Sequence, residues 1–244
     1  MTLKLPTMHG LIDRRILVNF RVRPETVAPL LPSFFRPKLV KGWAMAGICL
    51  IRLKDIRPHG LAAMFGVASE NAAHRIAVEW DDCGTTREGV FIPRRDTSSL
   101  LQSLVGGKVF PGIHHLADYV VNETLDDFQL QMQSRDDHTS VRLHVRRANR
   151  LPASSVFDSL EVASDFFARG AVGYSATTSP NCCDGLELST TSWRVESLEV
   201  LLVESSFFDD RQTFPTGTIE FDCALLMRNL RHEWRSLPQL KGVT

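Results

Sequence analysis

Two adjacent histidines, His114 and His115, directly follow a Pro111–Gly112 turn and are the first candidates for chemistry in the chain. Imidazole titrates near neutral pH, so a histidine can serve as a general acid, a general base or a metal ligand. If the segment after the turn is a strand, its successive side chains point to opposite faces. Only one of the two then faces a pocket, and two hydrogen-bonded or solvated strand residues are an equally open interpretation.

A metal held by this pair is disfavoured by the spacing of the other ligand types. A pair of histidine ligands on a strand is better placed at i and i+2, and these positions hold Leu116 and Ala117. Further ligands would have to come from His74, His144 or Glu70, whose spacing forms no metal motif. We therefore expect no metal and no other cofactor.

Arginines supply candidate anion-binding groups. Arg94 and Arg95 lie in the segment "IPRRDTSS" and could clamp an anion, because guanidinium matches the geometry of a carboxylate. They could equally form salt bridges at the rim of a sheet. Arg14 and Glu70 precede apolar runs, where such residues are most often exposed. The chain contains no P-loop, GxGxxG, GxSxG or HExxH pattern, so the familiar nucleotide-binding, hydrolase and zinc-protease mechanisms have no local support.

The composition is that of a globular protein without excess charge. Hydrophobic residues make up 43% of the chain, and 28 Lys and Arg residues balance 28 Asp and Glu residues. A surface for nucleic acid or an anionic membrane would need a basic excess, so neither partner is expected. No apolar run approaches the roughly 18 residues of a membrane span, and the N-terminus lacks a signal-peptide pattern. We therefore expect a soluble, cytoplasmic protein.

The cysteines are odd in number and lack CxxC spacing, which argues against a disulfide framework or a structural zinc site. We expect all of them to be free thiols. They are Cys49, Cys83, Cys182, Cys183 and Cys223.

Most of the chain has the pattern of β-strands. Two long apolar runs, 15–22 and 42–53, are rich in β-forming residues and bounded by turn residues. The sequences "DDCGTT" and "SRDDHT" suit hairpin turns. The other predicted strands are 75–80, 88–93, 128–133, 140–147, "SLEVLLVESSFF" and "GTIEFDCALLMR".

Two segments are expected to be helical. Residues 23–32 have a proline in the first turn and end at a proline, which is typical of a short helix. Residues 157–170 carry apolar side chains on one face, with Asp158 or Ser159 as the N-cap and Gly170 at the end.

Many strands, few helices and no linker or internal repeat predict one domain over residues 1–244. The expected fold class is mainly β (α+β), an antiparallel barrel or sandwich with a few helices on its rim. A barrel of this size can hold one small ligand.

Five segments are distinctive together: "IDRRILVNFRVRPETVAPLLPSFFRP", "FPGIHH", "GYSATTSP", "SWRVESLEV" and "IEFDCALLMRNLRHEW". In these segments, which span nearly the full length, the chain resembles the acetoacetate decarboxylase-like superfamily and a branch of it described as a domain of unknown function. The resemblance implies a closed, largely antiparallel β-barrel with a small-molecule ligand in its interior. It also allows a homo-oligomer.

The decarboxylases of this superfamily form a Schiff base between a β-keto acid and a reactive lysine that has a second lysine beside it. The resemblance places Arg14 and Glu70 at the positions of an arginine and a glutamate that assist in the pocket. Where the two lysines would stand, this chain has His114 and His115, and Lys108 lies too early in the strand to substitute. Imidazole forms no persistent imine with a ketone, so decarboxylation by the family mechanism is not expected.

The resemblance and the residues together predict an enzyme of lyase, isomerase or hydratase type that acts on a small carboxylated or β-dicarbonyl compound. His114 would be the acid/base, Glu70 its partner and Arg14 the anion clamp. The alternative is a non-catalytic small-molecule binding protein that kept the barrel and lost the chemistry. Further candidates are His115 for catalysis and Arg94 and Arg95 for substrate binding.

The family position favours His114 as the histidine that faces the pocket. Strand alternation would then place Leu116 and Asp118 on the inner face and Tyr119 on the other, which is the poorer hydrophobic pattern. A bulge at Gly112, or Asp118 at a polar mouth, would reconcile the two arguments. We expect the family position to determine the register, with His114 facing the pocket.

Overall fold

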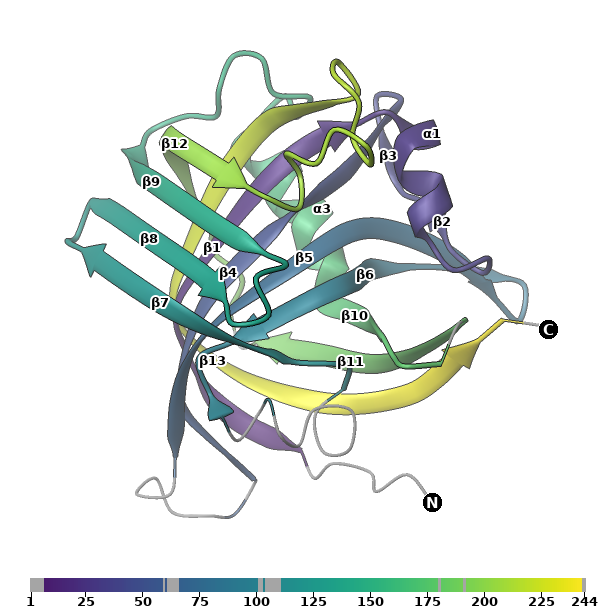
Figure 1. Cartoon of the computed structure of the whole chain (residues 1–244), viewed down its shortest axis with the longest axis horizontal. Coiled ribbons are helices and arrows are strands. Elements are labelled where there is room, and N and C mark those ends of the chain that lie inside the picture. Colours follow the sequence, from purple (N-terminus) through teal and green to yellow (C-terminus); the bar gives the residue numbers. More distant parts are fainter. Residues whose placement is uncertain are drawn as a thin grey trace.

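Thirteen β-strands form one sheet that carries most of the described chain (Figure 1). The computed structural model describes residues 7–58, 60, 66–100, 103, 111–179, 181–190 and 192–242. The strands are β1 (Met8–Val22), β2 (Arg36–Pro37), β3 (Leu39–Val40), β4 (Trp43–Pro58), β5 (Val67–Asp82), β6 (Thr85–Thr97), β7 (His115–Glu123), β8 (Asp127–Ser134), β9 (Ser140–Ala148), β10 (Val172–Ala176), β11 (Cys182–Thr190), β12 (Glu196–Ser205) and β13 (Ile219–Lys241). The helical elements are α1 (Pro24–Val27), α3 (Leu160–Ala168) and the 3-10 turns η1 (Ala28–Leu30) and η3 (Arg169–Ala171).

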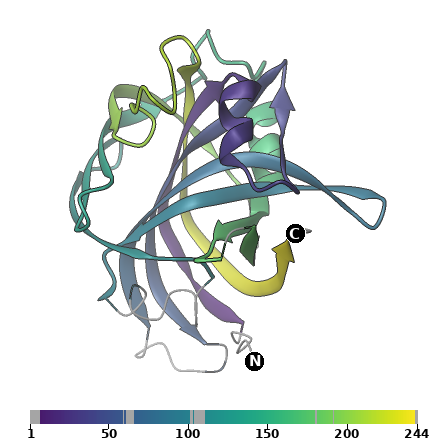
Figure 2. The same ribbon diagram turned by 45° about the vertical axis from the view of Figure 1, so that its right-hand side comes forward.

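The strand pairings form two rings. The large ring runs from β6 through β7, β8, β9, β12, β13, β1 and β4 to β5, which pairs back with β6. The small ring runs from β6 through β10 and β11 to β13 and returns along β1, β4 and β5. The strands β13, β1, β4, β5 and β6 belong to both rings and are called the shared wall. Figures 1 and 2 show the long β13 (yellow) curving from the large ring to lie under β10 and β11.

The fold is mainly β, as predicted. Among the described pairings, those of β6 with β7 and with β10 are parallel and the others are antiparallel. No described helix is long and apolar enough to cross a membrane. The five cysteines are free thiols, and three of them, Cys49, Cys183 and Cys223, are buried.

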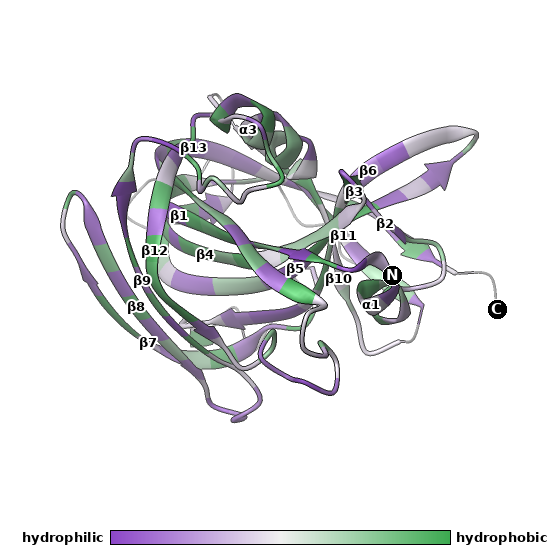
Figure 3. Ribbon diagram, turned by 90° about the horizontal axis from the view of Figure 1, so that it is seen from above, coloured by the Kyte–Doolittle hydropathy of each residue, from purple (hydrophilic) through white to green (hydrophobic). Residues whose placement is uncertain are grey.

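The shared wall is buried on both of its faces because alternate residues of each strand point into different rings. Ile16 and Ile48 belong to the main hydrophobic cluster, which includes residues of β8 and β9 in the large ring and extends to Tyr174 of β10 and Cys183 of β11. Leu17 and Met45 belong to a second cluster, which packs against α3. Figure 3 shows α3 on the side of the shared wall away from β7, β8 and β9. Strands buried on both faces have nearly continuous apolar sequences, which explains the uniform runs in β1 and β4.

Each predicted strand overlaps an observed one, and several observed strands are longer. The predicted ends differ by one to three residues in β4, β12 and β13, where Gly42, residues 206–208 and residues 217–218 lie outside the strands. The turn at "DDCGTT" is a two-residue hairpin, because Asp82 pairs with Thr85 and the intervening Cys83 and Gly84 have φ values of 48° and 82°. β10 and β11 were not predicted. Their sequences contain Gly173 and Gly185, and glycine is depleted in strands.

Both predicted helices are present. The first is α1 continued by η1, which begins at a proline and ends before Pro32. In α3 the Ser159 side chain accepts a hydrogen bond from the Val162 backbone N–H, so Ser159 is the N-cap. The predicted role of Gly170 was wrong. Gly170 has a φ of −83° inside η3, and α3 continues into this turn instead of ending at a left-handed glycine.

Candidate functional site

A cavity of about 130 Å³ lies within the small ring. The shared wall encloses the cavity on one side, and η3, β10, β11 and the end of β13 enclose it on the other. Most of the lining is apolar, and the polar part is dominated by cations. The polar and thiol side chains of the lining include Arg15, Cys49, Asn71, Arg75, Arg95, Asp96 and His114.

Three arginines surround the floor of this cavity because of the strand register. Cys49 on β4 is paired with Leu17 on β1 and with Ala73 on β5. Arg15 and Arg75 lie two residues from these partners and therefore point to the same face. Arg95 pairs with Ala73, because a register shift in β6 brings it onto this face. Three different strands thus direct guanidinium groups into one small space.

None of these three arginines forms an ion pair with a carboxylate of the described residues. The Arg15 Nε atom lies 3.2 Å from the Cys49 Sγ atom, and the Arg95 Nε atom donates to the Ser175 Oγ atom at 2.8 Å. Arg75 donates to the Asn19 side-chain oxygen. The Arg15 Nη1 and Arg75 Nε atoms are buried without a hydrogen-bond partner. The lining residue Asp96 is ion-paired with Arg94 at 2.7 Å, so the charges of Arg15, Arg75 and Arg95 have no carboxylate partner among the described residues.

Burial weakens the ionisation of these groups without abolishing it. Desolvation, with a further contribution from Arg15, lowers the pKa of Arg75 to about 10. Desolvation also lowers the pKa of Arg95 to about 10. Both guanidinium groups stay charged at neutral pH, so the unpaired charge of the cavity persists under ordinary conditions.

His114 reaches the cavity from the turn that precedes β7. Gly112 has a φ of 82°, and a side chain there would come within 2.4 Å of the Ser175 Cβ atom. The glycine thus allows the turn to lie against β10, and its N–H donates to Asp184 at 3.0 Å. His114 then lines the same cavity as Arg95.

The His114 ring is neutral in the unliganded protein. Desolvation and the charge of Arg95 lower its pKa to about 3. Its Nε2 atom lies 3.2 Å from the Pro111 carbonyl oxygen, which can only accept a hydrogen bond. The Nε2 atom therefore carries the proton, and the Nδ1 atom has the lone pair that a base requires.

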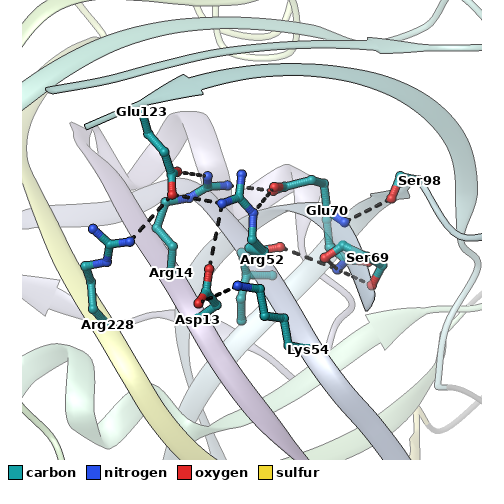
Figure 4. Close-up of polar contacts among 11 residues, drawn as sticks. Asp13, Arg14, Arg52, Lys54, Ser69, Glu70, Ser98, Glu123 and Arg228 are labelled. Carbon is teal, nitrogen blue, oxygen red and sulfur yellow. Dashed lines mark hydrogen bonds and ion pairs between the residues drawn. The ribbon is translucent and has the colours of Figure 1, made fainter. Parts of the chain in front are cut away.

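Arg14 and Glu70 point to the other face of the shared wall and do not line the cavity. The Arg14 side chain is fully buried, 2.6 Å from Glu70 and 2.5 Å from Glu123. Arg52 contacts the same two glutamates, and Arg228 lies 3.5 Å from Glu123 (Figure 4). These five residues are called the inner ion cluster. The sequence predicted that Arg14 and Glu70 lie together, and they do, but His114 does not join their ion pairs.

Arg94 and His115 form another polar group beside β7. Arg94 contacts Asp96 at 2.7 Å and Asp136 at 2.8 Å. The His115 Nδ1 atom lies 2.8 Å from the same Asp136, and desolvation with the charge of Arg94 lowers the His115 pKa. In the predicted pair Arg94–Arg95 only Arg95 lines the cavity, and in the pair His114–His115 only His114 does. Arg94 and His115 are instead bound to carboxylates.

The predicted register of β7 was wrong for Asp118. This residue is exposed and bound to Arg135 at 2.7 Å, whereas Tyr119 packs against the main hydrophobic cluster. The hydrophobic pattern thus determines which side chains of β7 point inward. β7 begins at His115, so the direction of His114 is fixed by the turn and not by strand alternation.

A second, wider hollow of about 700 Å³ is lined by polar residues near the start of β1. Its lining includes Asp55 and Glu233 as well as Arg57, Arg231 and Arg235, so it lacks a one-sided charge. Among the residues described here, no group of three or more His, Cys, Asp or Glu side chains could hold a metal ion. The cavity in the small ring is therefore the candidate site.

Sequence reasoning missed Arg15, Arg75 and Cys49. Each follows or lies within an apolar strand, where a polar residue is ordinarily assigned to the solvent side. A signal was nevertheless present in the dipeptides Arg14–Arg15, His74–Arg75 and Arg94–Arg95. Adjacent polar residues in a buried strand require a polar environment on both faces.

Comparison with known proteins gives a family match and a fold. The family model DUF2071, described as an uncharacterized conserved protein, matches residues 12–216. No curated protein matches the chain. An acetoacetate decarboxylase-like enzyme from Sphingomonas wittichii RW1 has a similar structure, with a TM-score of 0.58 and 13% identity over 100% of this chain and 95% of that one.

Two further structures are similar over most of their lengths. The enduracididine biosynthesis enzyme MppR complexed with pyruvate has a TM-score of 0.59 and 10% identity, covering 98% of this chain and 91% of that one. The acetoacetate decarboxylase from Legionella pneumophila subsp. pneumophila str. Philadelphia 1 has a TM-score of 0.58 and 12% identity, covering 100% and 90%. At these identities the likeness shows a common fold.

Proposed function

Because this chain belongs to the DUF2071 family and has the acetoacetate decarboxylase-like fold, we propose that it binds a small carboxylate in the cavity of the small ring and acts on it as an enzyme. In this proposal the small ring is a closed barrel that surrounds the ligand. The reaction class is proton transfer beside a carbonyl group, as in lyases, isomerases and hydratases.

The observation that carries the proposal is the uncompensated charge of Arg15, Arg75 and Arg95. A buried charge without a partner is costly, and a protein can retain it where a ligand supplies the opposite charge. A carboxylate matches the planar donors of guanidinium and can accept two hydrogen bonds from each. The arginines therefore support an anionic ligand.

The remaining lining supports a small ligand with an apolar end. Val90, Ile92, Leu186 and Leu188 are among the apolar lining residues. A volume of about 130 Å³ suits a molecule of a few heavy atoms. The similar enzyme MppR is complexed with pyruvate, a small 2-oxo carboxylate, which makes pyruvate a suitable first probe.

His114 is the proposed acid/base. Its pKa of about 3 makes it a weak base in the unliganded protein. Desolvation is the main cause of this low pKa and the charge of Arg95 is the second, so a bound carboxylate that offsets Arg95 would raise the pKa of His114. Binding and base strength are thereby coupled, so the histidine becomes a better base when a ligand is present.

The inner ion cluster has a different role in this proposal. Arg14 and Glu70 stabilise the shared wall through their mutual ion pair, and Arg95 replaces Arg14 as the anion clamp. The described lining residues include no lysine, and Lys108 lies outside the described residues. Acid/base chemistry by His114 is therefore the mechanism we propose in place of a Schiff base.

Binding is tested by NMR titration of isotopically labelled protein with pyruvate, acetoacetate and their neutral methyl esters. We expect saturable shifts of cavity residues with the acids and not with the esters. Arg95→Gln should weaken binding at least tenfold, whereas Arg135→Gln, which removes an exposed arginine of equal charge, should not. If no small carboxylate produces saturable shifts, or if both variants bind equally well, the proposed ligand class is wrong.

Catalysis is tested by hydrogen exchange of the bound acid in heavy water. A base beside the reacting carbon should replace the ligand's α-protons by deuterium, which proton NMR of the ligand detects. His114→Ala should abolish exchange and His115→Ala should retain it. Binding without exchange would favour the alternative function, a non-catalytic small-molecule binding protein. Loss of exchange in His115→Ala alone would assign the site to the other histidine.

A further inference from the structure

Cys49 lies on β4 and is one of the residues that line the cavity. Its partner on β5 is the small Ala73, whereas its partner on β1 is Leu17. The Arg15 Nε atom lies 3.2 Å from the sulfur.

A second observation points to a ligand at the same place. The Arg75 side chain lines the cavity and is only 7% exposed, and its Nε atom has no hydrogen-bond partner. Neighbouring strands are about 4.8 Å apart. Arg15 on β1 and Arg75 on β5 therefore flank Cys49 on β4, and Arg95 on β6 lies one strand beyond Arg75. The Arg15 Nε atom is 3.2 Å from the sulfur, so a carboxylate bound between Arg15 and Arg75 would lie beside it.

The other described cysteines lack this combination. Cys83 is exposed in the β5–β6 hairpin. Burial raises the pKa of Cys183 to about 12, and burial together with Asp222 raises the pKa of Cys223 well above its usual range. Cys49 is the one cysteine among the described lining residues of the cavity, which also include Arg15, Arg75 and Arg95.

We propose that Cys49 is a nucleophile of this site, which adds reversibly to the carbonyl carbon of a bound 2-oxo acid. The proposal rests on the proposed function, because the arginines must first bind the carboxylate. In the addition an S–C bond forms and the π bond of the carbonyl breaks. The carbonyl oxygen takes the electron pair and the proton lost by sulfur, so the product is a neutral thiohemiketal and no oxidant is needed.

The adduct is tested with pyruvate that is carbon-13 labelled at its carbonyl carbon. Addition converts this carbon from a trigonal to a tetrahedral centre, and its NMR signal moves far upfield. We expect the new signal with the unaltered protein and none with Cys49→Ser. Cys83→Ser is the matched control, since it removes a thiol outside the cavity and should leave the signal unchanged.

Alkylation tests the same thiol independently. Iodoacetate is a small carboxylate with an electrophilic carbon beside the acid group, whereas iodoacetamide is its neutral analogue. In each case sulfur displaces iodide and an S–C bond forms. With the rate at Cys83 as an internal reference, we expect iodoacetate to label Cys49 at least about tenfold faster than iodoacetamide does. Arg95→Gln should reduce this preference, and peptide mass spectrometry locates the label.

The outcomes separate the two proposals. If carboxylates bind in the titration but neither the adduct signal nor the iodoacetate preference is found, the role of Cys49 is wrong and the binding function stands. If the preference is found without an adduct for any 2-oxo acid tested, addition to a carbonyl is wrong. If no carboxylate binds, the proposed function fails and this inference fails with it.

Discussion

Arg14 and Arg15 are neighbours in the sequence with opposite surroundings. Arg14 is fully buried between Glu70 and Glu123, whereas Arg15 faces the cavity with the Cys49 sulfur and the ring of Trp193 as its contacts. A buried charge that is paired depends on its partner, and the partner depends on it. The two arginines should therefore contribute very differently to stability.

We expect Arg14→Met to lower the free energy of unfolding by about 3 kcal/mol, because it leaves two buried glutamates with less positive charge. Arg15→Met should change it by no more than about 1 kcal/mol, because no carboxylate loses a partner. Urea unfolding at pH 7 measures both. Equal losses for the two variants would contradict the assignment of paired and unpaired roles.

His74 is a buried histidine that should make the protein sensitive to acid. It is fully buried between Phe207 and Phe208, and desolvation with the charge of Arg94 lowers its pKa to about 3. Because the folded-state pKa is below the unfolded value of about 6.5, the unfolded chain takes up the proton first as the pH falls. Stability is therefore complete above pH 6.5 and declines from there toward pH 3.

We expect His74→Phe to reduce this decline. Between pH 7.5 and pH 5 the histidine accounts for about 2 kcal/mol, since each pKa unit corresponds to about 1.4 kcal/mol. The difference in unfolding free energy between these two pH values should be smaller by that amount in the variant. Comparing the difference, not the absolute stability, removes any packing cost of the larger ring. An unchanged difference would show that His74 is protonated in the folded protein.

The sequence predicted part of the site at this scale and missed the rest for a physical reason. Arg95 and His114 were candidates because arginine and histidine types suit anion binding and proton transfer. Arg15, Arg75 and Cys49 were not, because their environment is created by η3, β10 and β11, which are distant in sequence. A side chain that faces a second buried layer has the same local sequence pattern as one that faces solvent.

At the scale of single elements, α3 has two adjacent candidates for its N-cap. Ser159 accepts from the Val162 backbone N–H, whereas the exposed Asp158 carboxylate lies 2.6 Å from Lys41. We expect Ser159→Ala to lower stability by about 1 kcal/mol, which is typical for loss of a cap. Asp158→Ala should change it by less than about 0.5 kcal/mol, because an exposed ion pair contributes little. Thermal unfolding of both variants distinguishes the two, and a larger loss in Asp158→Ala would reverse the assignment.

Strands were predictable where burial gives a strong pattern. The uniform apolar runs of β1 and β4 arise from burial on two faces, and the alternation in β8 arises from burial on one. β10 and β11 carry glycines where the chain packs closely. A side chain at Gly185 would come within 2.7 Å of the Tyr174 ring. A glycine required by tertiary contacts is indistinguishable in the sequence from a glycine required by a turn.

At the scale of the whole molecule, β13 connects the two rings. It pairs with β12 and β1 in the large ring and with β11 in the small ring. Loss of either ring exposes one face of the shared wall, so neither ring keeps a complete core without the other. We therefore expect the two rings to unfold together.

This predicts one cooperative transition in urea. Trp80 belongs to the main hydrophobic cluster, and Trp193 packs against the cluster under α3. Fluorescence of variants that retain one of these tryptophans should give the same midpoint as the far-ultraviolet circular dichroism. Two separated midpoints would show that one ring is stable alone.

The two-sided character of the shared wall has a consequence for how sequences in this family diverge. The first residues of the Arg14–Arg15 and Arg94–Arg95 pairs are bound to carboxylates of the chain itself. Their replacement should be accompanied by compensating changes at those carboxylates. In the proposed function the second residues, together with Arg75, bind a ligand, and none of the three is paired with a carboxylate of the described residues. Family members that bind a different ligand should therefore differ at Arg15, Arg75 and Arg95 together. Substitutions at Arg14 and Arg94 should occur independently of these changes.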